Sequence, residues 1–244
     1  MGDRRPPPAR VSLANRLRHA LGLRQTLFVA GVRYREVSGE SLRHALSRKG
    51  RGYKEYDASF ADGTVMRIRC TLERDFEDLG GPRRLALYQR AEQLLRPGMR
   101  VVVLAAGTGY ASRWIADRVA PSGAVVAIDS DRESIEFARR RYPIANTSFE
   151  VGGLENTAGE TDEGFHAAVW VAPRIGDDPS PTLNELWRLI TRDGWLMLAA
   201  PGLDAARLIE AAAEICVKQH GGALSLVDRG DAWTTLVIRK PAPD

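Results

Sequence analysis

Two glycines and an aspartate have the residue types and the spacing of a nucleotide-binding site. Gly107 and Gly109 follow the apolar run 101–104, and Asp129 closes a second apolar run. Glycine permits a tight turn and lets a ligand approach the backbone closely. An acid about 20 residues beyond such a turn commonly accepts hydrogen bonds from two ribose hydroxyls. The stretch 101–129 therefore predicts the binding of a nucleoside-containing cofactor.

The elements that position these residues alternate between strand and helix. Uninterrupted apolar runs rich in β-branched residues are typical of strands buried on both faces of a parallel sheet. The expected strands are 101–104, 124–128, 147–151, 167–171 and 195–200, and the expected helices are 110–119, 132–141, 181–191 and 203–219. Strands separated by helices pair in parallel through right-handed crossovers. The last two strands, 223–227 and 233–239, have no helix between them and must be antiparallel. The predicted fold class is α/β.

The part of the chain before this sheet is predicted to be a small α+β extension. The tail 1–11 is expected to be disordered, because prolines and arginines cannot build a core. Residues 12–80 are expected to form the extension and residues 81–244 the sheet domain. Asp62-Gly63, between two apolar-rich segments, is a strong hairpin signal. Further expected elements are helices at 12–23, 38–46 and 83–95, a strand at 26–32 and a loop at 47–54.

Charge is unevenly distributed along the chain. The 244 residues have a net charge of +4, but the segment 1–56 has 13 Lys+Arg and 4 Asp+Glu, hence +9, and the remainder −5. A basic segment can attract nucleic acid or an anionic membrane surface. A solvated extension without a partner is the favoured interpretation, because aromatic residues are sparse and the pattern fits no nucleic-acid motif.

Composition favours a globular domain in the cytoplasm. Hydrophobic residues make up 44% and charged residues 27% of the chain, which is ordinary for such a domain. No apolar run approaches the roughly 20 residues of a membrane-spanning helix, and no signal-peptide pattern follows the basic start. Cys70 and Cys216 lie far apart without metal-ligand spacing. We expect them to be buried free thiols, and we expect no metal site.

Two classes of nucleoside cofactor fit a Gly-x-Gly turn followed by an acid. A nicotinamide dinucleotide site also requires glycine or alanine three positions after the second glycine, where this chain has Ser112. Its domain tends to continue with parallel strands, whereas this chain is expected to close with an antiparallel pair. Both observations favour a different nucleoside cofactor.

The stretch 83–240 resembles the class I S-adenosylmethionine-dependent methyltransferases. RPGMRVVVLAAGTGYAS followed by GAVVAIDSD matches the first two strand-and-loop motifs of that family in residue type and spacing. LWRLITRDGWLMLAAP looks like the family's helix, turn and fifth strand, and the closing strand pair is what its sheet requires. The resemblance implies a Rossmann-like, seven-stranded, mostly parallel sheet with an antiparallel C-terminal strand pair. It also implies S-adenosylmethionine as the cofactor.

The cofactor-binding positions follow from this resemblance. They are Ala105, Gly107, Thr108, Gly109, Asp129, Ser130, Gly153 and Leu154. The loop 107–109 would lie under the methionine part of the cofactor, and Asp129 would hold the ribose hydroxyls. Ser130 would lie beside the adenine, with Gly153 and Leu154 at its edge. The segment 171–174 would lie next to the transferred methyl group.

Three positions depart from the family pattern. Family members usually carry an acid at the position of Ala105, and often at the positions of Gly153 and His166. Each hydrogen bond lost in this way reduces the free energy of cofactor binding by roughly 1–3 kcal/mol. This loss lowers the affinity about ten- to a hundredfold. Backbone amides of the glycine loop remain available for binding. His166 is interpreted as a structural histidine rather than a base.

These features predict S-adenosylmethionine-dependent methyl transfer to an unidentified small molecule. The catalytic residues are not assigned, because methyl transfer relies mainly on proximity and orientation. The alternative is a catalytically silent relative whose basic segment 1–56 binds RNA or a protein partner. The sequence leaves the oligomeric state open.

Overall fold

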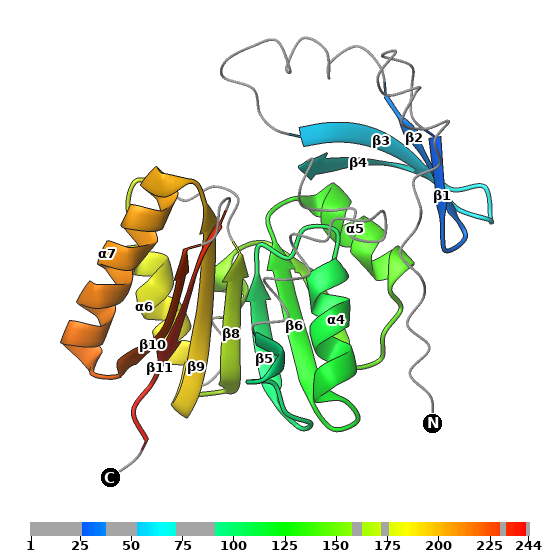
Figure 1. Ribbon diagram of the computed structural model, residues 1–244. Helices are drawn as coiled ribbons and strands as arrows, with labels where there is room; N and C mark the ends of the chain where they lie inside the picture. The colour runs from blue at the N-terminus through cyan, green and yellow to red at the C-terminus, as the bar shows by residue number, and fades with distance from the viewer. Residues whose placement is uncertain are drawn as a thin grey trace. The chain divides into compact units, whose positions relative to one another are not determined.

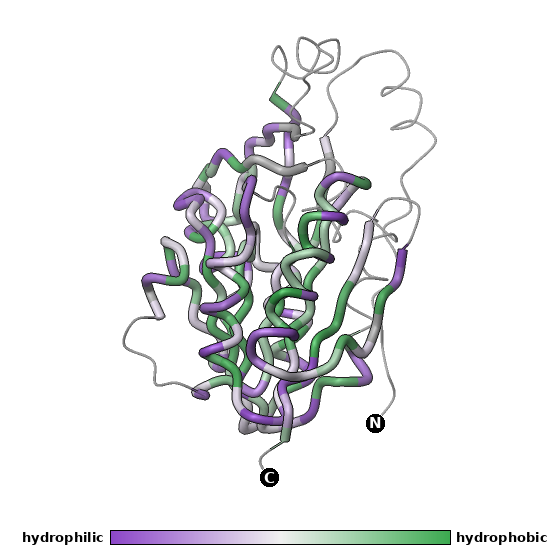
Figure 2. The backbone as a smooth tube through the Cα atoms, turned by 90° about the vertical axis from the view of Figure 1, so that its left-hand side faces the viewer, coloured by the Kyte–Doolittle hydropathy of each residue, from purple (hydrophilic) through white to green (hydrophobic). Residues whose placement is uncertain are grey.

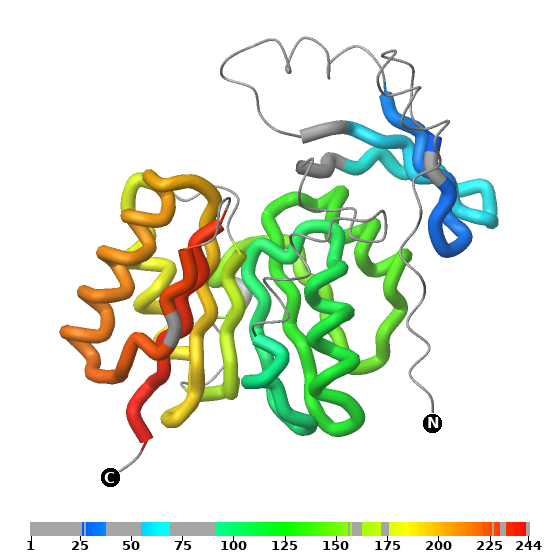
Figure 3. Tube along the Cα trace, in the orientation of Figure 1, coloured from blue at the N-terminus to red at the C-terminus, as the bar shows by residue number. Residues whose placement is uncertain are grey.

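The structure is a computed structural model in which the chain falls into two compact units, Met1–Ala86 and Leu87–Asp244. It describes residues 26–37, 53–71, 91–157, 163–171, 176–229 and 233–242 (Figure 3). Several predictions concern residues outside these ranges: the tail 1–11, the helices at 12–23 and 38–46, most of the helix at 83–95, and the domain boundary at 80.

The first unit contains a four-stranded antiparallel sheet (Figure 1). Its strands, in spatial as in chain order, are β1 (Thr26–Val29), β2 (Val32–Glu36), β3 (Tyr53–Ser59) and β4 (Val65–Thr71). The hairpin predicted at Asp62-Gly63 is confirmed, because it joins β3 to β4 with Ser59 opposite Val65. The Asp62 carboxylate accepts a hydrogen bond from the Thr64 backbone nitrogen at 3.0 Å, which closes this turn.

The strand predicted at 26–32 is wrong in its extent. The chain reverses at Ala30 and Gly31, so that β1 and β2 form a second hairpin with Val29 opposite Val32. Both turn residues have positive φ, 45° and 84°. The stretch 27–32, LFVAGV, contains no polar residue to mark a turn, yet glycine adopts this left-handed backbone at little cost. The run of hydrophobic residues therefore predicted one strand where the chain forms a hairpin.

The two faces of this small sheet differ in character. Tyr34, Ala58 and Ile68 point to one face and are fully buried, at 0–1% exposure. On the other face the Asp57 carboxylate bridges Arg35 and Arg67, at 3.0 Å from each guanidinium. The hydrogen bond from Arg35, assisted by Arg67, holds the pKa of Asp57 below its ordinary value. A cross-strand charge ladder thus covers the sheet face opposite the apolar one.

The second unit is an α/β fold with a seven-stranded sheet, which confirms the predicted fold class (Figure 1). The spatial strand order is β10-β11-β9-β8-β5-β6-β7. In chain order the elements are β5 (Arg100–Leu104), α4 (Tyr110–Val119), β6 (Ala124–Asp129), α5 (Arg132–Arg141), β7 (Thr147–Val151), the 3₁₀ turn η2 (Leu154–Thr157), β8 (Phe165–Val171), α6 (Ser180–Leu189), β9 (Ile190–Pro201), α7 (Leu203–His220), β10 (Ala223–Arg229) and β11 (Trp233–Arg239).

Strand pairing reverses the direction of winding at the centre of this sheet. β5 pairs in parallel with β6 on one side and with β8 on the other, so the direction of winding reverses at β5. β11 runs antiparallel to both β9 and β10, as predicted for the closing pair. In open α/β sheets, ligands bind beyond the carboxyl ends of the strands where the winding reverses. The carboxyl ends of β5, β6 and β8 are therefore the expected site.

Helices bury both faces of the sheet. α4 and α5 pack on β5, β6 and β7, whereas α6 and α7 pack on β9, β10 and β11. The core beneath α6 and α7 includes Val102, Leu186 and Ile209, all at 0–1% exposure. In Figure 2 the helix turns alternate between hydrophobic and hydrophilic colours, as expected when one stripe of each helix faces a sheet. This packing fixes the strand ends in position.

A lysine of the C-terminal segment binds the end of α6. The Lys240 ammonium donates to the carbonyls of Trp187 and Ile190, at 3.2 and 2.9 Å. A cation at the last carbonyls of a helix satisfies acceptors that lack intrahelical partners. The helix ends at Leu189, earlier than the predicted residue 191, because the backbone of Ile190 is already extended. Within the described residues, no helix is long and apolar enough to cross a membrane.

Candidate functional site

The loop 105–109 connects β5 to α4 at the carboxyl edge of the sheet. Ala106 donates from its backbone nitrogen to the Ile128 carbonyl at 3.0 Å, which extends the pairing of β5 with β6 into the loop. Ala105 has φ of 59°, an uncommon conformation for a residue with a side chain. Gly109 then begins α4 as its N-terminal cap, with φ of 86°. The predicted glycine turn therefore lies where the strand order reverses.

Gly109 is required by packing as well as by its backbone conformation. A Cβ added at this position would lie 2.7 Å from the Ala138 Cβ and 2.8 Å from the Phe149 ring. These neighbours belong to α5 and β7, so the glycine lets the start of α4 approach them closely. The sequence suggested ligand approach as the reason for this glycine, whereas the structure shows close approach between protein elements.

Asp129 ends β6 and connects the loops around it. Its Oδ2 accepts from the Gly107 backbone nitrogen at 2.7 Å, and its Oδ1 accepts from the Asp131 nitrogen at 2.9 Å. The residue is half-buried. A carboxylate has about four acceptor positions, so these two bonds leave capacity for two hydroxyl donors. Ser130, the next residue, is exposed at the same edge.

The turn after β7 lies against the same strand end. The Gly152 backbone nitrogen donates to the Asp129 carbonyl at 2.9 Å. Leu154, which begins η2, is partly buried and packs against the core beneath α6 and α7. The Glu155 carboxylate accepts from the Gly153 nitrogen at 2.7 Å. Glu155 is not among the predicted positions, because an exposed glutamate in a loop gives no sequence pattern that marks it.

His166 lies at the opposite end of the sheet from this group. It is the second residue of β8, and its Nδ1 accepts from the Arg100 backbone nitrogen at 2.9 Å. The Arg100 guanidinium lies 4.7 Å from the centre of the Phe165 ring and donates to the Gly164 carbonyl. His166 thus ties the start of β8 to the start of β5, in agreement with its structural interpretation.

The remaining predicted positions divide between the core and the residues outside the description. Val171 is 3% exposed and belongs to the buried core. Val171 ends β8, and the rest of the segment expected beside the methyl group, 172–174, lies outside the described residues. Within the described residues, no three His, Cys, Asp or Glu side chains gather as a metal site would require.

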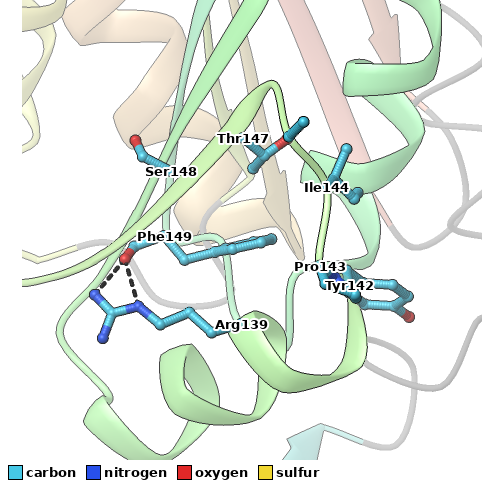
Figure 4. A pocket seen from close by; sticks show the side chains of 8 residues that line it. Arg139, Tyr142, Pro143, Ile144, Thr147, Ser148 and Phe149 are labelled. Carbon is cyan, nitrogen blue, oxygen red and sulfur yellow. Dashed lines mark hydrogen bonds between the residues drawn. The ribbon is translucent and has the colours of Figure 1, made fainter.

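A hollow of about 510 Å³ lies between α5 and β7 (Figure 4). Its lining residues are Arg139, Tyr142, Pro143, Ile144, Ala145, Thr147, Ser148 and Phe149. Figure 4 shows the Arg139 guanidinium donating to the Phe149 carbonyl, which belongs to the edge strand β7. None of the predicted cofactor positions lines this hollow. The Arg139 hydrogen bond joins α5 to the edge strand, and the hollow is separate from the candidate site.

Comparison with known proteins gives a consistent result. The family model of a methyltransferase domain matches residues 95–238, more than half of the chain. The protein-L-isoaspartate O-methyltransferase of Methanothrix thermoacetophila is 33% identical over 95 residues, 38% of this chain and 44% of that protein. An uncharacterised 37.1 kDa protein in transposon Tn4556 of Streptomyces fradiae is 31% identical over 111 residues, 45% of this chain and 32% of that protein. The chain thus spans less than half of these curated relatives.

A solved structure supports the fold independently. A SAM-dependent methyltransferase from Aquifex aeolicus superposes with a TM-score of 0.54 at 18% identity, covering 67% of this chain and 95% of the other. At this identity the likeness shows the fold alone. The fold and the match to the family model agree on the same part of the chain.

Proposed function

The chain belongs to the methyltransferase domain family, and we propose that it is an S-adenosylmethionine-dependent enzyme that methylates a small-molecule acceptor. One observation carries the proposal. The Asp129 carboxylate stands at the end of β6 and bonds the glycine loop through Gly107 and the start of α5 through Asp131. A polar group held in this way at the reversal of the strand order is suited to a ribose.

The residues at this edge fit S-adenosylmethionine. Asp129 retains acceptor capacity for the two ribose hydroxyls. The loop 105–109 offers backbone and small side chains beneath the methionine part. Ser130 and Leu154 lie on the two turns that follow β6 and β7, on either side of an adenine bound beyond them. The cofactor would therefore be held by Asp129 and by the backbone of three loops.

Bound S-adenosylmethionine supplies a methyl group activated by a positively charged sulfur. The chain would hold the ribose through Asp129 and the methionine part against the loop 105–109. The acceptor would then approach the methyl group in line with its bond to sulfur. Orientation of this kind accounts for much of the rate of a bimolecular reaction. We infer that the acceptor approaches over the carboxyl ends of β8 and β9. Leu203, which begins α7 two residues after the end of β9, is 76% exposed and offers an apolar contact.

The charge of the catalytic part favours a small acceptor over a nucleic acid. The residues after 56 have a net charge of −5, which opposes the approach of a polyanion. We propose the cytoplasm as the compartment, since Cys216 is a buried free thiol and such thiols are typical of reducing compartments. The proposed acceptor is therefore a small molecule and not a polyanion.

Calorimetric titration tests the proposal directly. We expect S-adenosylmethionine and S-adenosylhomocysteine to bind the folded chain with dissociation constants in the micromolar range, as for substrates of most enzymes. Label from the methyl group of S-adenosylmethionine should then enter the small-molecule fraction of a metabolite extract. No heat at high micromolar ligand, with folded protein, overturns cofactor binding. Label found only in RNA overturns the acceptor class.

The alternative, a catalytically silent protein that binds RNA or a partner through its basic front segment, is less well supported. In the described part of that segment, Arg35 is already paired with Asp57 at 3.0 Å. The match to the family model concerns the sheet domain and adds nothing to an RNA-binding role. Salt-dependent RNA binding that is lost on deletion of 1–56, together with no cofactor binding, would favour this alternative.

A further inference from the structure

Two exposed apolar side chains lie in one row across the four-stranded sheet of the first unit. Phe28 of β1 is 73% exposed, and Val65 of β4 is 59% exposed. Phe28 pairs with Arg33 on β2. Arg33 pairs with Ser59 on β3, and Ser59 pairs with Val65. Directly opposed residues of antiparallel strands point to the same face, so these four residues form one row on the face opposite the buried one. Neighbouring strands lie about 4.8 Å apart, and the row therefore spans about 14 Å.

The row lies beside two hairpin turns. Strands β1 and β3 run in the same direction, because each pairs antiparallel with β2. The turn 30–31 after β1 and the turn 60–64 after β3 therefore lie at the same end of the sheet, where Figure 3 draws them as a blue and a cyan loop. Phe28 precedes the first turn, and Val65 directly follows the second. The exposed apolar side chains thus gather at one end of one face.

Arginine side chains stand on the same face. Arg33 lies within the row, is exposed and, in the part of the chain that the structure describes, forms no hydrogen bond or ion pair. In the next row, Arg35 and Arg67 flank Asp57, each at 3.0 Å, so two cations share one anion. Glu55, further from the turns on β3, adds a second acid. The face therefore combines exposed apolar side chains with an excess of positive charge.

The charge of the whole first unit has the same sign. Residues 1–86 contain 18 Lys+Arg and 10 Asp+Glu, hence +8, whereas residues 87–244 contain 17 Lys+Arg and 21 Asp+Glu, hence −4. A large positive charge attracts anionic partners over distances of about 8 Å at physiological ionic strength. The first unit is thus complementary to an anionic surface, and the second unit is not.

We propose that the face defined by Phe28, Arg33 and Val65 docks the protein on an anionic phospholipid surface. Aromatic and aliphatic side chains enter the boundary between headgroups and acyl chains, and each arginine near the surface is attracted by anionic headgroups. A single-stranded nucleic acid instead requires planar side chains on which bases stack, and Val65 offers none. A lipid surface is therefore the anionic partner that fits both ends of the row. The docking does not depend on cofactor binding, and the competing explanation is a solvated face without a partner.

Sedimentation of the full chain with vesicles tests this docking. The native chain should bind vesicles of phosphatidylcholine mixed with phosphatidylglycerol, should not bind phosphatidylcholine alone, and should be released as salt is added. Phe28→Thr and Val65→Thr keep a strand-forming residue and should each weaken binding about tenfold, because one apolar side chain returns to water. Arg33→Gln should weaken binding about fivefold. Ile215→Thr on α7 and Arg132→Gln on α5 change exposed residues of the second unit and should retain native binding.

Fluorescence shows whether the apolar row enters the lipid. Phe28→Trp and Ile215→Trp each add one tryptophan, and brominated acyl chains should quench the added emission only in Phe28→Trp. Equal quenching of the two variants, equal binding by the native chain and Phe28→Thr, or no sedimentation of the native chain overturns the proposal. Release by inorganic phosphate at constant ionic strength, or tighter binding of single-stranded RNA that is lost in Phe28→Thr, assigns the face to a free ion or to nucleic acid and overturns it as well.

Discussion

The Asp129 carboxylate lies 2.7 Å from the backbone nitrogen of Gly107, a residue 22 positions earlier in the chain. The bond joins the end of β6 to the glycine loop that follows β5. It orients the carboxylate and the loop together before any ligand binds. A site whose groups are already oriented loses less conformational entropy on binding.

Asp129→Asn should weaken both the loop and the site. The asparagine amide has one acceptor oxygen, so its NH₂ group would face the nitrogen of either Gly107 or Asp131, donor against donor. We expect the free energy of unfolding to fall by about 1–3 kcal/mol and the affinity for S-adenosylhomocysteine to fall at least tenfold. Chemical denaturation and calorimetry measure the two effects.

Asp178→Asn is the matched control for this substitution. Asp178 also accepts from a backbone nitrogen, that of Ser180 at 2.9 Å, and Ser180 holds its pKa below the ordinary value. It stands before α6, and its replacement should leave ligand affinity unchanged. Native affinity in Asp129→Asn would show that the ribose is held elsewhere.

Gly109→Ala should destabilise the second unit. The new methyl would lie under 3 Å from Ala138 and Phe149, at a residue whose φ is 86°. Overpacking and the left-handed backbone together predict a loss of about 2–4 kcal/mol. The melting temperature should fall by roughly 5–15 °C. In Gly176→Ala the methyl meets open space, so we expect a change of less than about 0.5 kcal/mol. Equal melting temperatures for the two variants would contradict the packing argument.

His166→Ala should lower stability without affecting the cofactor. The substitution leaves the Arg100 nitrogen without the acceptor that now lies at 2.9 Å. We expect a loss of about 1–2 kcal/mol, whereas His166→Asn, whose side-chain oxygen replaces Nδ1, should retain most of the stability. Because His166 lies at the amino end of β8, calorimetry should give native ligand affinity for both variants. A large loss of affinity would place His166 in the site.

The Cys216 thiol should be unreactive in the folded chain. It is 1% exposed, and burial raises its pKa from 9.0 to about 11. Between these values the folded chain holds the proton more tightly than the unfolded chain, so the contribution to stability is complete below pH 9 and is lost as the pH rises toward 11. In a Cys70→Ser background, a thiol reagent at pH 8 should react fast only after unfolding. Between pH 9 and 11 the free energy of unfolding should fall less steeply in Cys216→Ala than in the same background with Cys216 intact. Fast reaction of the native chain would contradict this prediction.

The sheet domain was predictable because its signals are local. Apolar runs, the helices between them and the final pair without a helix dictate a parallel sheet with an antiparallel end, and the structure has this order. The hairpin at Asp62-Gly63 was predictable for the same reason. The turn at Ala30 and Gly31 was missed because an unbroken apolar run concealed it. The sheet register came from the structure, since it depends on pairing between distant segments.

By itself, the sequence determined the α/β class, the order of strands and helices, and the place of Gly107 and Asp129 at the ends of neighbouring strands. Periodicity and turn chemistry act between residues close in the chain, so they can be read from it. Only the tertiary structure decided that Gly109 makes room for Ala138 and Phe149, and that His166 binds Arg100 far from the site. It also placed the Glu155 carboxylate over Gly153. These relationships depend on the direction of side chains after folding, which the order of residues alone does not specify.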